Sequence, residues 1–183
     1  MLTIAQAAFH LDIPLRAIRS WMRRELVEGV REGRLPLPAL VQAHFLRSLL
    51  RTGMSGTVLA DVATDFGQLW PARQELVKAV SRRAKNVDFA QVLDEHTALV
   101  AVDADGMPQA IRLRSYWEQG VAVVVDPRTA EGRPVYEHSG VPVLNVVRAF
   151  LTGERPIDIA WEHSVQLDDV HGVLRVHLEL THL

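Results

Sequence analysis

The sequence contains no cysteine among its 183 residues. This absence excludes disulfide bonds, thiolate metal sites and a cysteine nucleophile, because each of these needs a thiol. Lysine is also scarce, since Lys78 and Lys85 are the lysines among 20 cationic residues. Either GC-rich codon usage or a need for bidentate phosphate contacts can produce such a bias toward arginine, and we favour codon usage.

Long apolar runs are missing too. No stretch of about 18 apolar residues occurs, and the first residues lack a basic segment followed by an apolar one. The hydrophobic fraction of 48% is nevertheless high enough for a buried core. We therefore expect a folded cytoplasmic protein without a membrane segment.

Motifs for catalysis are absent as well. The sequence has no HExxH pair, phosphate-binding glycine loop or nucleophile elbow. His171, His177 and His182 are six and five residues apart, so a helix does not place them on one face. Asp103 begins a segment similar to a calcium loop, but the twelfth position is Arg114 instead of glutamate. We expect no enzyme, metal or cofactor.

The net charge of −2 hides two halves of opposite sign. Residues 1–85 carry 13 Lys and Arg against 7 Asp and Glu, a balance of +6. Residues 86–183 carry 7 against 15, a balance of −8. An anionic partner is therefore expected for the first half only.

Residues 14–24 are predicted to form a helix with an arginine face. Proline suits the first turn of such a helix, where its missing N–H is not needed. Helical spacing predicts an apolar stripe of Leu15, Ile18 and Met22 and, opposite it, a polar stripe of Arg16, Arg19, Ser20 and Arg23. A short helix of this kind, entered through a turn from another short helix, has the shape of a DNA recognition helix.

The neighbouring elements are predicted in an order that suits this interpretation. Thr3 is a plausible N-cap for a helix over 4–11, and residues 12–14 form the turn. Two glycines in 27–37 indicate a short hairpin or wing. A helix follows over 38–52, with the predicted inward residues Leu40, Ala43, Leu46 and Leu50 and the predicted outward residues His44, Arg47, Ser48 and Arg51. Ser55 begins a further helix.

Three segments carry a resemblance to the MerR-type winged helix-turn-helix over residues 1–66, namely 3–8, 13–21 and 46–55. The resemblance implies that the second helix enters the major groove and that the wing touches the flanking backbone. Carried over to this sequence, it matches Arg16 and Arg19 with base or phosphate contacts and Trp21 with the family's aromatic. Beside these we predict DNA contacts for Ser20, Arg23 and Arg24, and for Arg31 and Arg34 in the wing. The wing departs from the family by being short and by containing Glu25, Glu28 and Glu32, which weaken attraction to phosphate. A solvated amphipathic unit is the alternative.

The middle of the chain is predicted to contain a helix and a hairpin. Residues 71–85 form the helix, and its last cations either complement the helix dipole, which we favour, or extend a phosphate-binding surface. Residues 98–102 and 109–113 are strand-like and flank a turn at 103–106.

Residues 120–178 are similar to the bacterial domain of unknown function 433. The residues that carry this resemblance are a strand ending in Asp126-Pro127, the segments 132–135 and 139–143, a helix, and the segments 152–154 and 157–160. A last helix opens with Asp168 and Asp169, where negative charge is favoured. The family is a small helical module resembling a helix-turn-helix.

The combination of a MerR-like N-terminus with this module resembles VapB-type antitoxins of toxin–antitoxin systems. The companion of such an antitoxin is a PIN-like ribonuclease toxin. These resemblances imply a DNA-binding repressor, in dimeric form, that binds operator DNA with its N-terminal domain and a toxin with its acidic half. Two alternatives stay open: a free-standing MerR-like regulator with an effector, and a protein-binding module without DNA binding.

The predicted fold class is mainly α with short β elements. The predicted domains are a winged helix-turn-helix over 1–66, a connecting helix and hairpin over 67–119, and an antitoxin-like helical module over 120–183.

Overall fold

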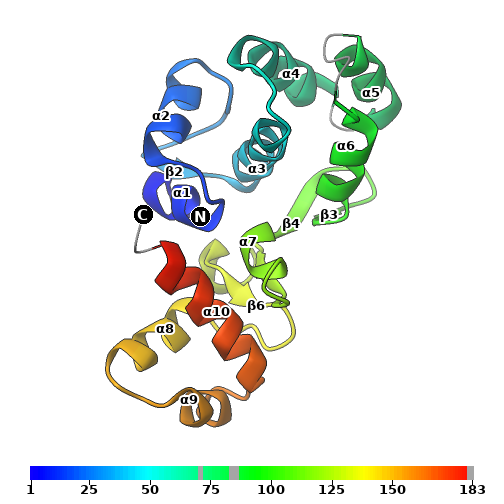
Figure 1. The fold of residues 1–183 in the computed structure, drawn as a ribbon. Coiled ribbons are helices and arrows are strands. Elements are labelled where there is room, and N and C mark those ends of the chain that lie inside the picture. Colours follow the sequence, from blue (N-terminus) through cyan, green and yellow to red (C-terminus); the bar gives the residue numbers. More distant parts are fainter. Residues whose placement is uncertain (70–71, 83–86, 181–183) are drawn as a thin grey trace. The chain divides into compact units, whose positions relative to one another are not determined.

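The computed structural model describes residues 1–69, 72–82 and 87–180 and divides the chain into two compact units. The N-terminal unit comprises residues 2–109, and the C-terminal unit comprises Met1 and residues 110–183. Both consist mainly of helices with short antiparallel strands (Figure 1). The predicted fold class is confirmed at this level. None of the helices in the described part of the chain is long and apolar enough to span a membrane.

The N-terminal unit is built around one central helix. Its elements are β1 (Leu2–Thr3), α1 (Ile4–His10), α2 (Leu15–Arg23), β2 (Arg34–Leu35), α3 (Leu37–Arg51), α4 (Gly56–Leu69), α5 (Arg73–Ser81), α6 (Phe89–Thr97) and β3 (Val100–Val102). Helix α3 packs on α4, α6 and β2, while α1 packs on α2. Strands β1 and β2 are antiparallel, with Leu2 opposite Leu35.

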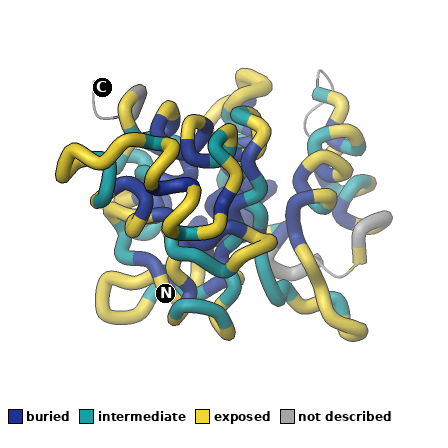
Figure 2. Tube along the Cα trace, turned by 90° about the horizontal axis from the view of Figure 1, so that it is seen from below, coloured by how far each residue is buried: buried dark blue, intermediate teal, exposed yellow. Residues whose placement is uncertain are grey.

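Aromatic rings fill the core where α3, α4 and α6 meet. The ring of Phe45 stacks on that of Phe66 at 4.2 Å and meets Phe89 edge-on at 5.7 Å between ring centroids. All three side chains are buried, and Figure 2 shows buried and exposed stretches alternating along the helices. Burial of this kind contributes roughly 25 cal/mol per Å² of apolar surface, so this cluster stabilises the packing of α3, α4 and α6.

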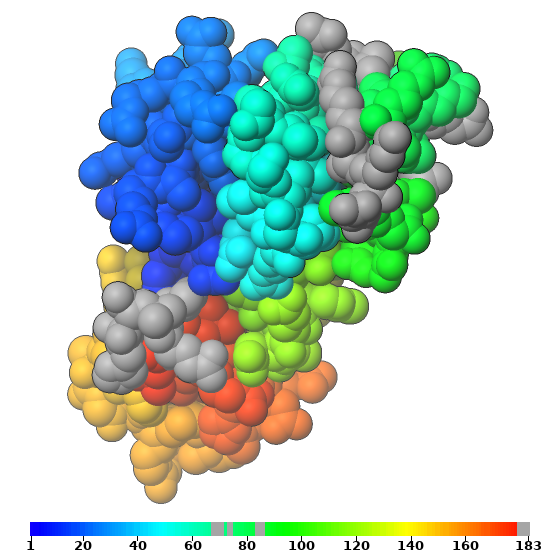
Figure 3. Space-filling view, turned by 45° about the horizontal axis from the view of Figure 1, so that its top comes forward, coloured from blue at the N-terminus to red at the C-terminus, as the bar shows by residue number. Residues whose placement is uncertain are grey.

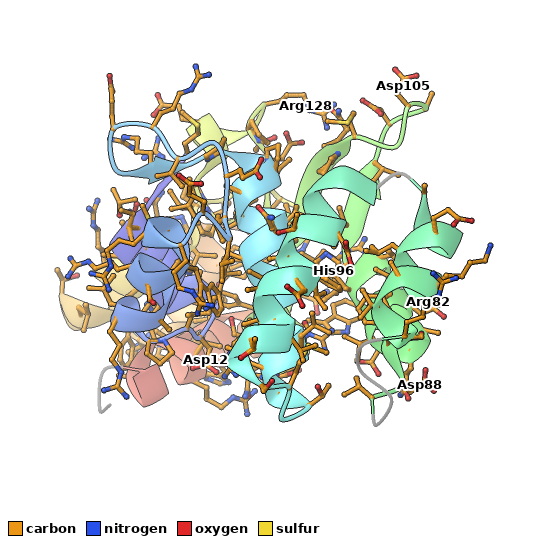
Figure 4. The ribbon with its side chains drawn as sticks, turned by 90° about the horizontal axis from the view of Figure 1, so that it is seen from above. Asp12, Arg82, Asp88, His96, Asp105 and Arg128 are labelled. Atoms are coloured by element: carbon orange, nitrogen blue, oxygen red, sulfur yellow. The ribbon has the colours of Figure 1, made fainter. Side chains whose placement is uncertain are left out.

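Part of the face of α3 that was predicted to point outward is buried in the structure. His44 and Ser48 are buried, although the sequence pattern placed them outside, and Leu50 is only half-buried. The His44 and His96 Nδ1 atoms are 2.8 Å apart, and His96 lies between the helices in Figure 4. One ring nitrogen donates and the other accepts, so this hydrogen bond joins α3 to α6. The pattern failed because α3 is covered on more than one side.

The structure differs from the sequence-based expectation in one additional helix and in the wing. Helix α6 was not anticipated. The wing is a tight turn in which Arg31 and Arg34 exchange backbone hydrogen bonds, and β2 pairs with β1 instead of with a second wing strand. The helix predicted over 71–85 is α5, and residues 70–71 and 83–86 at its expected ends lie outside the described residues.

The C-terminal unit combines strands with three packed helices. Its elements are β4 (Pro108–Arg112), whose first two residues belong to the other unit, α7 (Arg114–Trp117), β5 (Val123–Val125), a 3-10 turn (Ala130–Gly132), β6 (Val135–Tyr136), α8 (Val143–Leu151), α9 (Pro156–Glu162) and α10 (Leu167–Leu180). The sheet has the order β3-β4-β5-β6, which confirms the predicted hairpin. Helices α8, α9 and α10 pack on one another.

Helix α10 begins as the sequence suggests, and its packing partners come from the structure. Asp168 and Asp169 lie in its first turn, as predicted. Gly172 faces Val121, and the Tyr116 hydroxyl lies 3.1 Å from the His177 Nε2. His182, the last of the three histidines considered above, lies outside the described residues.

Candidate nucleic-acid interface

Helix α1 leads into α2 through a tight, well-defined turn. Thr3 caps α1 as predicted, and Gln6 completes a capping box by accepting from the Thr3 backbone N–H at 2.9 Å. The turn then bends at Asp12, which has a left-handed φ of 50°. The Ile13 N–H donates to the Ala8 carbonyl at 2.9 Å and closes the end of α1. These local bonds fix where α2 begins.

Two arginines of α3 hold this turn in place. The Arg47 guanidinium donates to the Asp12 backbone carbonyl at 2.7 Å and to its carboxylate at 2.5 Å. Arg51 reaches the same carboxylate at 3.3 Å, and Asp12 is labelled in Figure 4. Arg47 and Arg51 were predicted only to face outward, so sequence reasoning missed that they position the α1–α2 turn. Helical spacing carries no signal about which loop an outward arginine will meet.

Helix α2 has one buried side and one exposed cationic side. Ile18 and Trp21 are buried and anchor it, while the predicted apolar residues Leu15 and Met22 are only half-buried. On the other side Arg16, Arg19 and Arg23 are exposed, and Ser20 is half-buried. Among the described residues no carboxylate forms an ion pair with these three arginines. They are therefore available to an anion in solution.

The remaining predicted DNA-contacting residues lie after this helix. Arg24 is exposed and donates to the Gly56 carbonyl at 3.5 Å, at the start of α4. Arg31 and Arg34 are exposed at the tight turn before β2. In the space-filling view the segment of α2 and the following turn forms open surface of the N-terminal unit (Figure 3, blue).

Three exposed carboxylates share this turn, those of Glu25, Glu28 and Glu32. Glu25 takes the left-handed conformation that ends α2, and the Glu28 backbone N–H donates to Gln42 at 3.1 Å. Gln42 is buried and also donates to the Ala63 carbonyl at 3.3 Å, which ties the turn to α3 and α4. The cationic character is thus strongest on α2 and diluted in the turn.

Two acidic side chains elsewhere, those of Asp103 and Asp126, form hydrogen bonds within the protein. The Asp103 carboxylate accepts from the N–H groups of Asp105 and Met107, at 3.0 and 2.9 Å, and so shapes the β3–β4 turn. Arg128 holds the pKa of Asp126 below its usual value through direct hydrogen bonds. In the described part of the chain no cluster of three metal-ligating side chains forms.

The comparisons with known proteins point in one direction. No protein-family model matches the chain. A protein of Mycobacterium tuberculosis named Putative antitoxin VapB45 is 21% identical over 220 aligned positions, covering 94% of this chain and 91% of that protein. The crystal structure of Rv2018 from the same organism matches with a TM-score of 0.78 at 19% identity, covering 94% of this chain and 96% of that one. The chain therefore shares that fold along nearly its full length and has weak homology to a VapB antitoxin.

Proposed function

We propose that this chain is a cytoplasmic DNA-binding antitoxin that represses its own operon and neutralises a PIN-like ribonuclease toxin. The observation that carries the DNA-binding half is the exposed face of α2, where Arg16, Arg19 and Arg23 have no internal ion-pair partner in the described structure. Homology to VapB45 over 94% of the chain supports the antitoxin half.

The DNA-binding domain is assigned to residues 1–66 as a MerR-like winged helix-turn-helix. The clamped turn at Asp12 supports this assignment, because a recognition helix needs a fixed angle to the helix before it. Residues 67–119, of which α5 and α6 pack within the N-terminal unit, then lead to a module of the domain of unknown function 433 over 120–183. Arg16 and Arg19 reach base edges or phosphates in the major groove, and Ser20, Arg23 and Arg24 add contacts beside them.

The turn after α2 makes a smaller contribution. Arg31 and Arg34 contact the flanking backbone, but Glu25, Glu28 and Glu32 reduce the local positive charge. Base recognition therefore rests mainly on α2. A homodimer would place two such helices one helical turn of DNA apart, about 34 Å, on a two-fold symmetric operator.

The test is a DNA-binding titration with the double variant Arg16→Ala/Arg19→Ala and the DNA upstream of its own gene. We expect affinity to fall about 100-fold, because each specific contact is worth about 1–3 kcal/mol. The salt dependence should also weaken by about one unit of slope for each phosphate that the variant no longer neutralises. The matched control is Arg148→Ala/Arg175→Ala, which removes the same charge from exposed positions of the C-terminal unit.

The possible results of this titration distinguish the antitoxin from the two alternative functions, a free-standing regulator and a protein-binding module. Equal binding by the double variant and the wild type would contradict the assignment of α2 as the recognition helix. If the wild-type chain does not bind DNA at all, a protein-binding module becomes the better description. Specific DNA binding without a toxin gene beside this one would favour a free-standing regulator.

A further inference from the structure

Helices α8 and α9 repeat the turn geometry of α1 and α2. In each pair a residue in the left-handed conformation follows the first helix, Asp12 in one and Gly153 in the other. The N–H of the next residue donates to the carbonyl five residues earlier, at 2.9 and 3.1 Å. The chain thus presents two short helices in similar local settings, and their exposed faces can be compared directly.

The exposed face of α9 is apolar where that of α2 is cationic. Trp161 is 86% exposed and Ile157, one turn earlier, is 53% exposed. The opposite side of the helix is anchored by Ile159 and Ala160, which are buried. A single exposed apolar side chain is ordinary, but a tryptophan paired with isoleucine at i and i+4 forms a continuous apolar strip.

The segment that carries this strip is acidic. Residues 143–169 carry five carboxylates against two arginines. One of the two, Arg155, donates to both carboxylate oxygens of Asp158 at 2.5 and 2.8 Å, which lowers the pKa of Asp158 and neutralises that charge locally. Glu154 and Glu162, at the two ends of α9, are exposed. The strip is therefore an apolar centre with a negative border.

This combination selects among possible occupants. A nucleic acid is disfavoured, because its phosphates would meet the carboxylates. A second copy of the same face is also disfavoured, because a two-fold contact brings like charges together. A protein with an apolar pocket bordered by lysine or arginine satisfies both the strip and its border.

We propose that the α9 face, defined by Ile157 and Trp161 with Glu154 and Glu162 at its border, is the docking surface for a basic protein partner. Trp161 enters an apolar pocket of the partner, and the border carboxylates meet its cations. This inference rests on the proposed function, in which that partner is the ribonuclease toxin.

The experiment compares Trp161→Ala with Trp117→Ala as a matched control. Trp117 is a second exposed tryptophan of the same unit, on α7, at 53% exposure. The probe is the purified product of the PIN-like reading frame that the proposed function places beside this gene, and its affinity for the full chain is measured by calorimetry. We expect Trp161→Ala to weaken binding at least about 30-fold, since central tryptophans are typical hot spots, and Trp117→Ala to change it less than about threefold.

A charge variant tests the border separately. Glu162→Gln should lower the association rate and reduce its dependence on salt, because border charges act mainly on encounter. Thermal melting should be unchanged for Trp161→Ala, since little of its side chain is buried in the chain itself.

The outcomes distinguish this inference from the function on which it rests. Wild-type-like binding by Trp161→Ala would place the toxin contact elsewhere and overturn the α9 assignment, while the antitoxin role would stand. No binding by the wild-type chain would overturn both. Loss of self-association in Trp161→Ala, measured by light scattering, would identify the face as a homodimer contact and overturn the proposal.

Discussion

Gly172 is the position at which helix α10 comes closest to the segment before β5. A Cβ atom built on Gly172 would lie 2.2 Å from the Val121 Cγ2 and 3.2 Å from the Gln119 carbonyl oxygen. Ordinary carbon contacts are about 3.5–4.0 Å, so one side must move by more than about 1 Å. Val121 is buried and β-branched, and it therefore has little freedom to turn away.

We therefore expect Gly172→Ala to destabilise the protein, against its helix propensity. Propensity alone predicts a gain of about 1 kcal/mol for alanine in a helix. Overpacking a buried contact typically lowers the free energy of unfolding by about 1–3 kcal/mol. We expect a value at the upper end here, because the Val121 side chain is stiff and cannot turn away. The net expectation is a loss of about 1–2 kcal/mol, or a drop of about 2–8 °C in melting temperature.

The assay is urea unfolding followed by far-ultraviolet circular dichroism, with Val121→Ala and the double variant beside it. Val121→Ala alone leaves a cavity, which the methyl group introduced by Gly172→Ala would partly fill. The double variant should therefore be more stable than the sum of the single effects by at least about 1 kcal/mol. Gly56→Ala is the control, because nothing lies within 4 Å of a Cβ there. A Gly172→Ala protein as stable as the wild type, or more so, would refute the steric reasoning.

Two further predictions concern the turn before α2 and the packing of α10. Asp12→Asn keeps a residue that tolerates the left-handed conformation but removes the charge that Arg47 and Arg51 contact. Thermal melting should show a loss of about 0.5–2 kcal/mol in the free energy of unfolding. The affinity for DNA should fall as well, because the turn positions α2. An unchanged melting temperature would mean that the clamp does not stabilise the turn. Burial lowers the pKa of His177 to about 4 from about 6.5, so the unfolded chain binds more protons between these values. The contribution of His177 to the free energy of unfolding should be complete above pH 6.5 and be lost as the pH falls toward 4. We expect this loss to be about 1–2 kcal/mol after allowing for partial solvent screening. Denaturation curves measured across that pH range should show the slope, and His177→Gln should remove it.

Several local features could be predicted from the sequence because they depend on neighbours along the chain. The Thr3 cap, the bounds of α2, the β3–β4 hairpin and the acidic first turn of α10 all involve residues within one or two turns of each other. Spacing also placed Arg16, Arg19 and Arg23 on one exposed face. That these arginines contact DNA stays a prediction.

The remaining features depend on residues far apart in the sequence. A periodic pattern indicates which side of a helix is apolar, but it does not say how many sides other elements cover. His44 is buried because α6 packs against α3, and Arg47 meets Asp12 because the turn comes to lie beside α3. The sequence pattern assigned no role to Trp161, and it is exposed because Ile159 and Ala160 already supply the buried side of α9. Local spacing was thus enough to specify most helices and the placing of their charges. Which faces stay open to partners depended on the packing of the whole chain, since burial is a property of elements brought together and not of any one segment.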